Sequence, residues 1–188
     1  MKVLSINADH KRCQMIGADG PSWVYDTLPT GVGQPRVERW EQPTFSVDDP
    51  GKVRGEFLLL ALACMVTTRE VTQALGACVA SDVQVLPVTL ADTEQAYCVW
   101  NTTNFVDALD TTRTQFKPPP FSSTPSRWVF DARVLVRPML FRLPQNPATL
   151  LTVSECGDPA ADFYRCYRRL RMRGLKFELL WSSEDDRA

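Results

Sequence analysis

Apolar and polar residues alternate along several short stretches of the chain, which is the pattern that half-buried β-strands produce. The run VQVLPVTL, residues 83–90, shows this clearly, although Pro87 places that strand at an edge or a bulge. The turn ADTE links it to the next apolar run, 96–106, so the two predict a hairpin. Further strands are predicted at residues 1–7, in two pieces of 128–144 separated at Arg137 and Pro138, and at 149–154 and 175–181.

Two other segments carry helix signals. In VTTREVTQALG, Thr67 and Glu70 have the spacing of a capping box, and Gly76 is a stop signal. They predict a helix over residues 68–75 that buries Val71, Ala74 and Leu75.

The second helix signal lies near the C-terminus. Asp158 is a capping residue and Pro159 suits the first helical position, which predicts a helix that ends at Gly174. Its apolar stripe comprises Ala160, Phe163, Cys166, Tyr167 and Leu170. Arg165, Arg168 and Arg169 fall on the opposite, polar face of the predicted helix.

Glycine and proline dominate the N-terminal region, where only short strand-like pieces are predicted, at 23–26 and 37–42. The segment 111–127, with three consecutive prolines, is predicted to be irregular. We expect four aromatic residues to anchor the N-terminal region to a core: Trp23, Tyr25, Trp40 and Phe45. The predicted fold is a single α+β domain, mainly an antiparallel sheet with a few short helices. A loop-rich β region (1–54) is expected to pack on an α+β part (55–181), and a polar tail (182–188) follows.

Charge is unevenly distributed along the 188 residues, although the net charge is only −1. Residues 1–112 carry 8 basic and 14 acidic side chains, whereas residues 113–176 carry 12 basic and 4 acidic ones. The acidic segment 82–110 contains Asp82, Asp92, Glu94, Asp107 and Asp110 without any basic residue. This segregation suits electrostatic docking of a partner, or else the two halves neutralise one another within the fold.

Common catalytic and metal-binding patterns are missing from the sequence. The six cysteines show no CxxC spacing and the chain has one histidine, which argues against a zinc site and against a histidine-assisted nucleophile. No phosphate-binding loop or dinucleotide motif occurs. We therefore expect no metal and no cofactor, while a carboxylate-based hydrolase stays open as an alternative. The longest apolar run, 57–66, is too short to cross a bilayer, and no secretory signal is visible. We therefore expect a cytoplasmic location.

Two segments offer candidate sites. Asp107 and Asp110 could be catalytic or could hold a metal, but residues three apart on a strand point to opposite faces, so we favour a solvent-facing Asp107 and an Asp110 that begins a turn. The arginine-rich run 165–173 could bind phosphate or a nucleic-acid backbone, or could be a solvated helix face. Its nearby aromatics would suit base stacking, yet Phe163 and Tyr167 lie on the apolar stripe.

Several segments together resemble a bacterial family, family eleven of the immunity proteins of polymorphic toxin systems. The resemblance covers about residues 55–181, and its order and spacing matter more than any single motif. It is carried by VTTREVTQAL (66–75), VLPVTL (85–90), WNTTNFVDALD (100–110), MLFRLP (139–144) and RGLKFELLW (173–181).

The resemblance implies an α+β protein that binds a cognate toxin and blocks it by occlusion, without catalysis. In it the DALD segment is a scaffold feature at a strand end. The acidic segment 82–110 would suit a basic toxin such as a nuclease, and we favour it over the arginine-rich helix, which would suit an acidic toxin. A nucleic-acid-binding module using residues 113–176 is the alternative. The expected partner-binding residues are Trp100, Asp107, Asp110, Arg165, Arg168 and Arg169.

Overall fold

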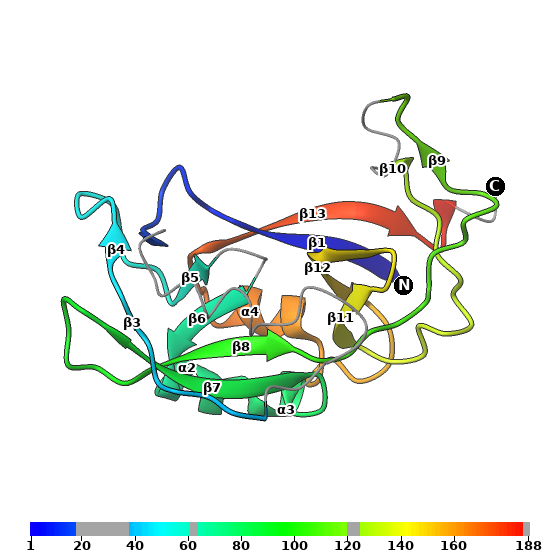
Figure 1. Cartoon of the computed structure of the whole chain (residues 1–188). Coiled ribbons are helices and arrows are strands. Elements are labelled where there is room, and N and C mark those ends of the chain that lie inside the picture. Colours follow the sequence, from blue (N-terminus) through cyan, green and yellow to red (C-terminus); the bar gives the residue numbers. More distant parts are fainter. Residues whose placement is uncertain (18–37, 61–63, 120–124, 186–188) are drawn as a thin grey trace.

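Two sheets make up the centre of the computed structural model, which describes residues 1–17, 38–60, 64–119 and 125–185 (Figure 1). The five-stranded sheet has the order β3-β7-β8-β6-β5, and only its short β3–β7 pairing is parallel. Its strands are β3 (Thr44–Phe45), β5 (Phe57–Leu60), β6 (Cys64–Thr68), β7 (Val83–Leu90) and β8 (Tyr97–Thr102). The predicted hairpin is confirmed as β7 and β8, where Pro87 lies opposite Cys98.

The four-stranded sheet is antiparallel throughout and has the order β11-β12-β1-β13. Its strands are β1 (Lys2–Ala8), β11 (Met139–Leu143), β12 (Asn146–Ser154) and β13 (Leu175–Ser182). The first strand of the chain therefore pairs with two strands that lie more than 130 residues later. The division of the chain at residues 54 and 181 stays a prediction.

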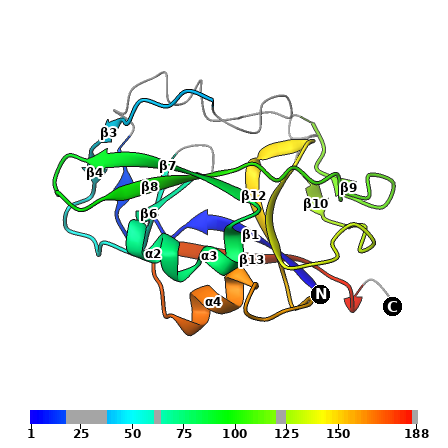
Figure 2. The same cartoon turned by 90° about the horizontal axis from the view of Figure 1, so that it is seen from below.

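Three short helices complete the described part of the chain: α2 (Arg69–Ala74), α3 (Gly76–Val79) and α4 (Phe163–Arg169). Figure 2 shows them gathered on one side of the molecule. The mixed α+β, mainly antiparallel fold is the class that the alternation predicts. In the ranges that the structure describes, none of these helices has the length and apolar character needed to cross a membrane.

The core consists of three apolar clusters. The central one joins both sheets to the helices through side chains such as Phe57, Trp100 and Phe163. The second covers the other face of the five-stranded sheet, where Phe45 and Trp40 anchor the N-terminal region as predicted. The third covers the outer face of the four-stranded sheet with residues of the long connection between β8 and β11. Trp23 and Tyr25 lie outside the described residues.

The first helix begins one residue later than predicted. Thr68, not Thr67, is its N-cap, and its hydroxyl accepts a hydrogen bond from the Val71 amide at 3.3 Å. The Thr67 hydroxyl donates instead to the backbone oxygen of Glu56, the residue before β5, which local sequence could not reveal. Gly76 does not stop the chain's helical path, because α3 begins there. Leu75 is buried as predicted, whereas Ala74 is exposed.

The C-terminal helix is shorter than predicted at both ends. Asp162 is its N-cap, and Asp158 makes only a local turn by accepting from the Ala160 amide at 2.8 Å. Asp162 is favoured as the N-cap because its carboxylate also accepts a hydrogen bond from the Ser154 hydroxyl of β12, which links the helix to the sheet. Of the predicted stripe, Phe163, Cys166 and Tyr167 are buried, while Ala160 and Leu170 are exposed.

Other differences lie in the connections. The segment 128–136 holds only an isolated bridge between Phe130 and Leu109, and residues 38–42 form no strand. The strand predicted to reach residue 106 ends at Thr102. Short strand pairs occur where irregular chain was predicted: β9 (Gln115–Phe116) with β10 (Pro125–Arg127), and β2 (Met15–Ile16) with β4 (Val47–Asp48). The piece predicted at 23–26 is not among the described residues.

Candidate functional site

Trp100 belongs to the core and not to the surface. Its side chain has 0% exposure and packs edge-to-face against Phe57, with ring centroids 5.4 Å apart. Its indole nitrogen donates to the Thr72 hydroxyl at 2.9 Å. Because no part of Trp100 reaches solvent, it cannot contact a docked partner, and we remove it from the candidate surface.

Asp107 and Asp110 have separate hydrogen-bond partners, and the structure shows no contact between them. Asp107 is exposed and accepts a hydrogen bond from the Gln145 side chain at 2.6 Å. The Asp110 carboxylate accepts from the hydroxyl and amide of Thr112 and from the amide of Arg113, so it fixes a turn, as predicted. Hydrogen bonding to Thr112 lowers the pKa of Asp110.

Of the other three acidic residues of this segment, Asp82 and Asp92 pair with arginines, whereas Glu94 is exposed. Asp82 is fully buried and forms an ion pair with Arg137, with 2.5 Å between the closest oxygen and nitrogen atoms. It also accepts from the Leu140 amide at 2.9 Å. Asp92 forms an ion pair with Arg54. Carboxylates with internal partners offer little unpaired charge, so this segment is a weaker docking surface than its sequence suggests.

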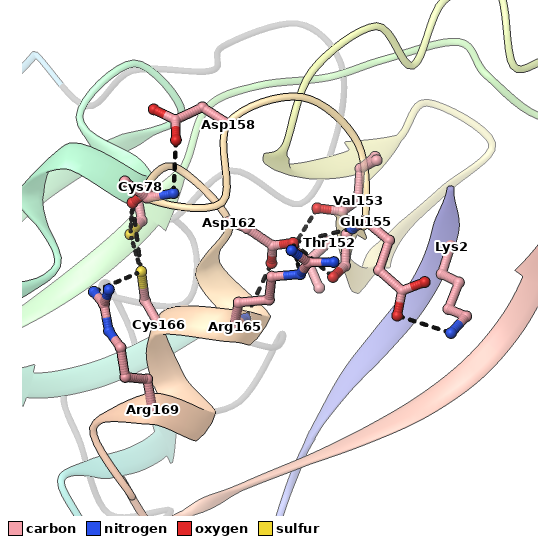
Figure 3. Close-up of polar contacts among 12 residues, drawn as sticks. Lys2, Cys78, Thr152, Val153, Glu155, Asp158, Asp162, Arg165, Cys166 and Arg169 are labelled. Atoms are coloured by element: carbon pink, nitrogen blue, oxygen red, sulfur yellow. Dashed lines mark hydrogen bonds and ion pairs between the residues drawn. The ribbon is translucent and has the colours of Figure 1, made fainter.

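The predicted arginines of α4 have three different environments. Arg165 lies 3.5 Å from the carboxylate of Asp162, the helix cap (Figure 3). Arg169 donates to the sulfur of Cys166 at 3.5 Å. Arg168 lines two adjoining hollows at the end of α4, of about 580 Å³ and 550 Å³. The structure therefore brings Arg168 to a concave site but not the other two.

We call these two hollows together the basic groove. They share the side chains of Asp9, Arg12, Tyr167, Arg168 and Leu175. Six basic residues line the groove against two acidic ones, Asp9 and Glu178. The basic residues are Lys11, Arg12, Arg168, Arg171, Arg173 and Lys176.

A helix-ending motif places one of these arginines. The amide of Met172 donates to the Tyr167 carbonyl at 3.2 Å, and that of Arg171 donates to the Arg168 carbonyl at 3.2 Å, which together form a Schellman motif. The motif needs a left-handed residue at Arg171, whose φ is +54°. Glycine usually occupies this place because a side chain is strained there. An arginine here holds a cation at the groove at a cost in backbone energy.

The floor of the groove is rigid. The Tyr167 hydroxyl accepts from the Leu175 amide at 3.0 Å and donates to the Leu175 carbonyl at 3.2 Å, and burial raises the pKa of this tyrosine. Gly174, with a φ of +111°, passes so close to β5 that an added Cβ would lie 1.8 Å from the Phe57 carbonyl oxygen. The prediction that Gly174 ends the helix is therefore wrong, since α4 ends at Arg169. Gly174 instead lets the chain pass from α4 to β13.

Some of the groove's charge is already neutralised. Arg173 pairs with Glu56 at 3.2 Å, and Lys176 pairs with Asp9 at 3.2 Å. Partial burial raises the pKa of Glu56, but hydrogen bonds from Arg173 outweigh this effect and lower it. Among the described residues, the remaining four cations have no carboxylate within ion-pair distance, and all four are exposed: Lys11, Arg12, Arg168 and Arg171.

The sequence revealed only half of this groove. The run 165–173 marks an arginine-rich segment, but it does not indicate that Arg171 would face a hollow. Lys11 and Arg12 reach the groove because β1 pairs with β13, a contact across more than 160 residues that no local pattern signals.

Such a site can bind anions and acidic surfaces through charge-assisted hydrogen bonds. In the portion of the chain that is described, no three side chains of histidine, cysteine, aspartate or glutamate come together in a way that could hold a metal ion. Comparison with models of known protein families finds no match for this chain, and comparison with curated proteins finds none either. The function is therefore inferred from the site and from the segments that resemble the immunity family.

Proposed function

We propose that this chain is a cytoplasmic immunity protein that neutralises a bacterial toxin by binding it, and that the basic groove docks an acidic surface of that toxin. The observation that carries the docking site is Arg171. A charged side chain stands in a left-handed position that favours glycine, and it lines the same groove as three other cations without ion-pair partners. Strain of this kind accumulates at functional sites.

The basic groove suits an acidic partner surface, which is the opposite of the basic surface expected from the sequence. From the sequence, the acidic segment 82–110 suits a basic toxin. Asp82 and Asp92, however, each have an arginine partner, and Asp110 fixes a turn. Lys11, Arg12 and Arg168 instead present positive charge in a concave setting, which steers an acidic partner toward the groove and orients it there.

The toxin as partner comes from the resemblance to the immunity family. The segments that resemble the family fall on β6 and α2, on β7, on β8 and the chain that follows, on β11 and on β13. Their strands belong to both sheets. Inhibition by occlusion requires a rigid surface. The hydrogen bonds of Tyr167 to Leu175 and the close passage of Gly174 over Phe57 support such rigidity at the groove.

Growth of bacteria that produce the toxin domain encoded next to this chain's gene tests the proposal. We expect wild-type protein to restore growth and to co-purify with the toxin. The Arg168→Glu variant should bind the toxin about tenfold or more weakly and restore growth less well while keeping its fold, because Arg168 is an exposed helix residue. Absence of both rescue and complex with the wild-type protein would refute the immunity function.

A nucleic acid is the second candidate ligand, because the same groove also contains the half-buried rings of Tyr164 and Phe177. These rings pack edge-to-face at 4.9 Å, which does not present the parallel faces on which successive bases stack. Salt-dependent retention of labelled oligonucleotides by the wild-type protein, lost in Arg168→Glu, would favour this candidate over a toxin.

A further inference from the structure

Two cysteines from different helices are in contact in the interior of the protein. Cys78 of α3 and Cys166 of α4 are 88 residues apart in the sequence, and their sulfur atoms are 3.0 Å apart (Figure 3). Both side chains are nearly buried, with 5% and 2% exposure. Both sulfur atoms also lie near the Ala160 carbonyl oxygen, at 3.1 Å and 3.4 Å.

This contact differs from those of the other thiols. The sulfur atoms of Cys98 and Cys156 contact oxygen atoms, the hydroxyl of Thr72 and the carbonyl of Leu135. A disulfide bond is about 2.05 Å long, so the sulfur atoms of Cys78 and Cys166 need to approach by only about 1 Å to form one. The packing of α3 against α4 already supplies the proximity that most pairs of thiols lack.

We propose that Cys78 and Cys166 are an oxidation site, at which a two-electron oxidant such as hydrogen peroxide joins α3 to α4 by a disulfide. The thiolate of one cysteine attacks the peroxide, which breaks the O–O bond, gives a sulfenic acid and releases one water after proton uptake. The second sulfur then attacks the sulfenic sulfur and displaces a second water. Two thiols are oxidised to one disulfide, and one peroxide is reduced to two waters.

The rate of this reaction is set by thiolate formation. Burial raises the pKa of Cys78 to about 12, so little thiolate is present at neutral pH. The groups that face it are Cys166, whose hydrogen bond raises this pKa further, Asp162, which also raises it, and Arg169, which lowers it. Oxidation through Cys78 should therefore accelerate about tenfold for each unit by which the pH is raised, until the pH reaches that pKa.

The disulfide closes a loop of nearly ninety residues, so it should stabilise the fold by restricting the unfolded chain. We expect the melting temperature to rise by roughly 5–15 °C on oxidation. Because α4 carries Arg168 at its outer end, the bond would also fix one wall of the basic groove. The proposal itself does not depend on what the groove binds.

Intact mass and peptide mapping after peroxide treatment of the folded protein test the proposal directly. We expect a loss of two hydrogens and a linked pair of peptides that contain Cys78 and Cys166, which reducing agent separates. Cys98→Ser is the matched control, since Cys98 is similarly buried, and it should form the same bond. Cys78→Ser should form none and should accumulate singly oxidised Cys166.

A linked peptide of any other composition would overturn the proposal, and so would full recovery of both thiols in the wild-type protein at a pH where Cys98 is oxidised. Because the mapping uses the wild-type chain, the result does not depend on whether a variant folds.

Discussion

Replacing Arg171 by glycine should stabilise the protein and weaken its binding at the same time. The left-handed backbone at this position costs an L-residue about 1–2 kcal/mol. Glycine escapes that cost but loses about 0.5–1 kcal/mol more backbone entropy on folding, so the net gain is about 0.5–1 kcal/mol. For a chain of this size, that gain corresponds to a melting temperature higher by roughly 1–4 °C.

The binding loss follows from the removed charge. Arg171 is exposed and lines the groove, and one exposed charge pair contributes up to about 1 kcal/mol, or about fivefold in the dissociation constant. Urea denaturation measures the first effect and titration calorimetry with the toxin measures the second. Arg171→Ala is the control, since it removes the charge but keeps the strained backbone: it should weaken binding without stabilising the fold. If Arg171→Gly is less stable than wild type, the strain argument is refuted.

Three further substitutions test the fold that supports the groove. Asp82→Ala should cost about 3 kcal/mol of unfolding free energy in urea, because it leaves the buried Leu140 amide without its acceptor and Arg137 without its ion-pair partner. Asp131→Ala, at a surface ion pair, should change stability little. Gly174→Ala should cost about 3 kcal/mol or more because its Cβ meets a backbone oxygen 1.8 Å away, while Gly51→Ala, with open space around it, should be nearly neutral in the same assay. The pKa of Glu56 is lowered in the folded protein, so its contribution to stability is present above about pH 4.5 and disappears as acid protonates it. The stability difference between wild type and Glu56→Gln should therefore vanish as the pH falls through that pKa, and a constant difference would contradict this assignment.

Strands were predictable from the sequence because their signal is local. Alternation along 83–90 reports which side chains face the core, and β7 occupies those residues. Helix ends were less predictable, because several capping candidates compete. Thr67 and Asp158 satisfy the local rules, yet Thr68 and Asp162 are the caps, since the Glu56 carbonyl engages Thr67 and Ser154 of β12 reinforces Asp162.

The site was half predictable for the same reason. The arginine-rich run indicated Arg168 as a candidate. The groove also needs Lys11 and Arg12, however, and these lie beside Arg168 only because β1 pairs with β13. Trp100 was predicted as a partner-binding residue, but it is buried in the core. Its strand is buried on both faces, so a large aromatic side chain there fills the core, and residue type alone cannot distinguish that role from a binding contact.

The dissociation constant of the complex with the toxin, measured for wild type and for Arg168→Glu, tests the central claim most directly. If the basic groove docks an acidic surface, charge reversal should weaken binding by about tenfold or more, and added salt should reduce the difference. Arg133→Glu is the control, because Arg133 pairs with Asp131 and does not line the groove. Equal affinities for wild type and Arg168→Glu would contradict the account, since the groove would then play no part in binding.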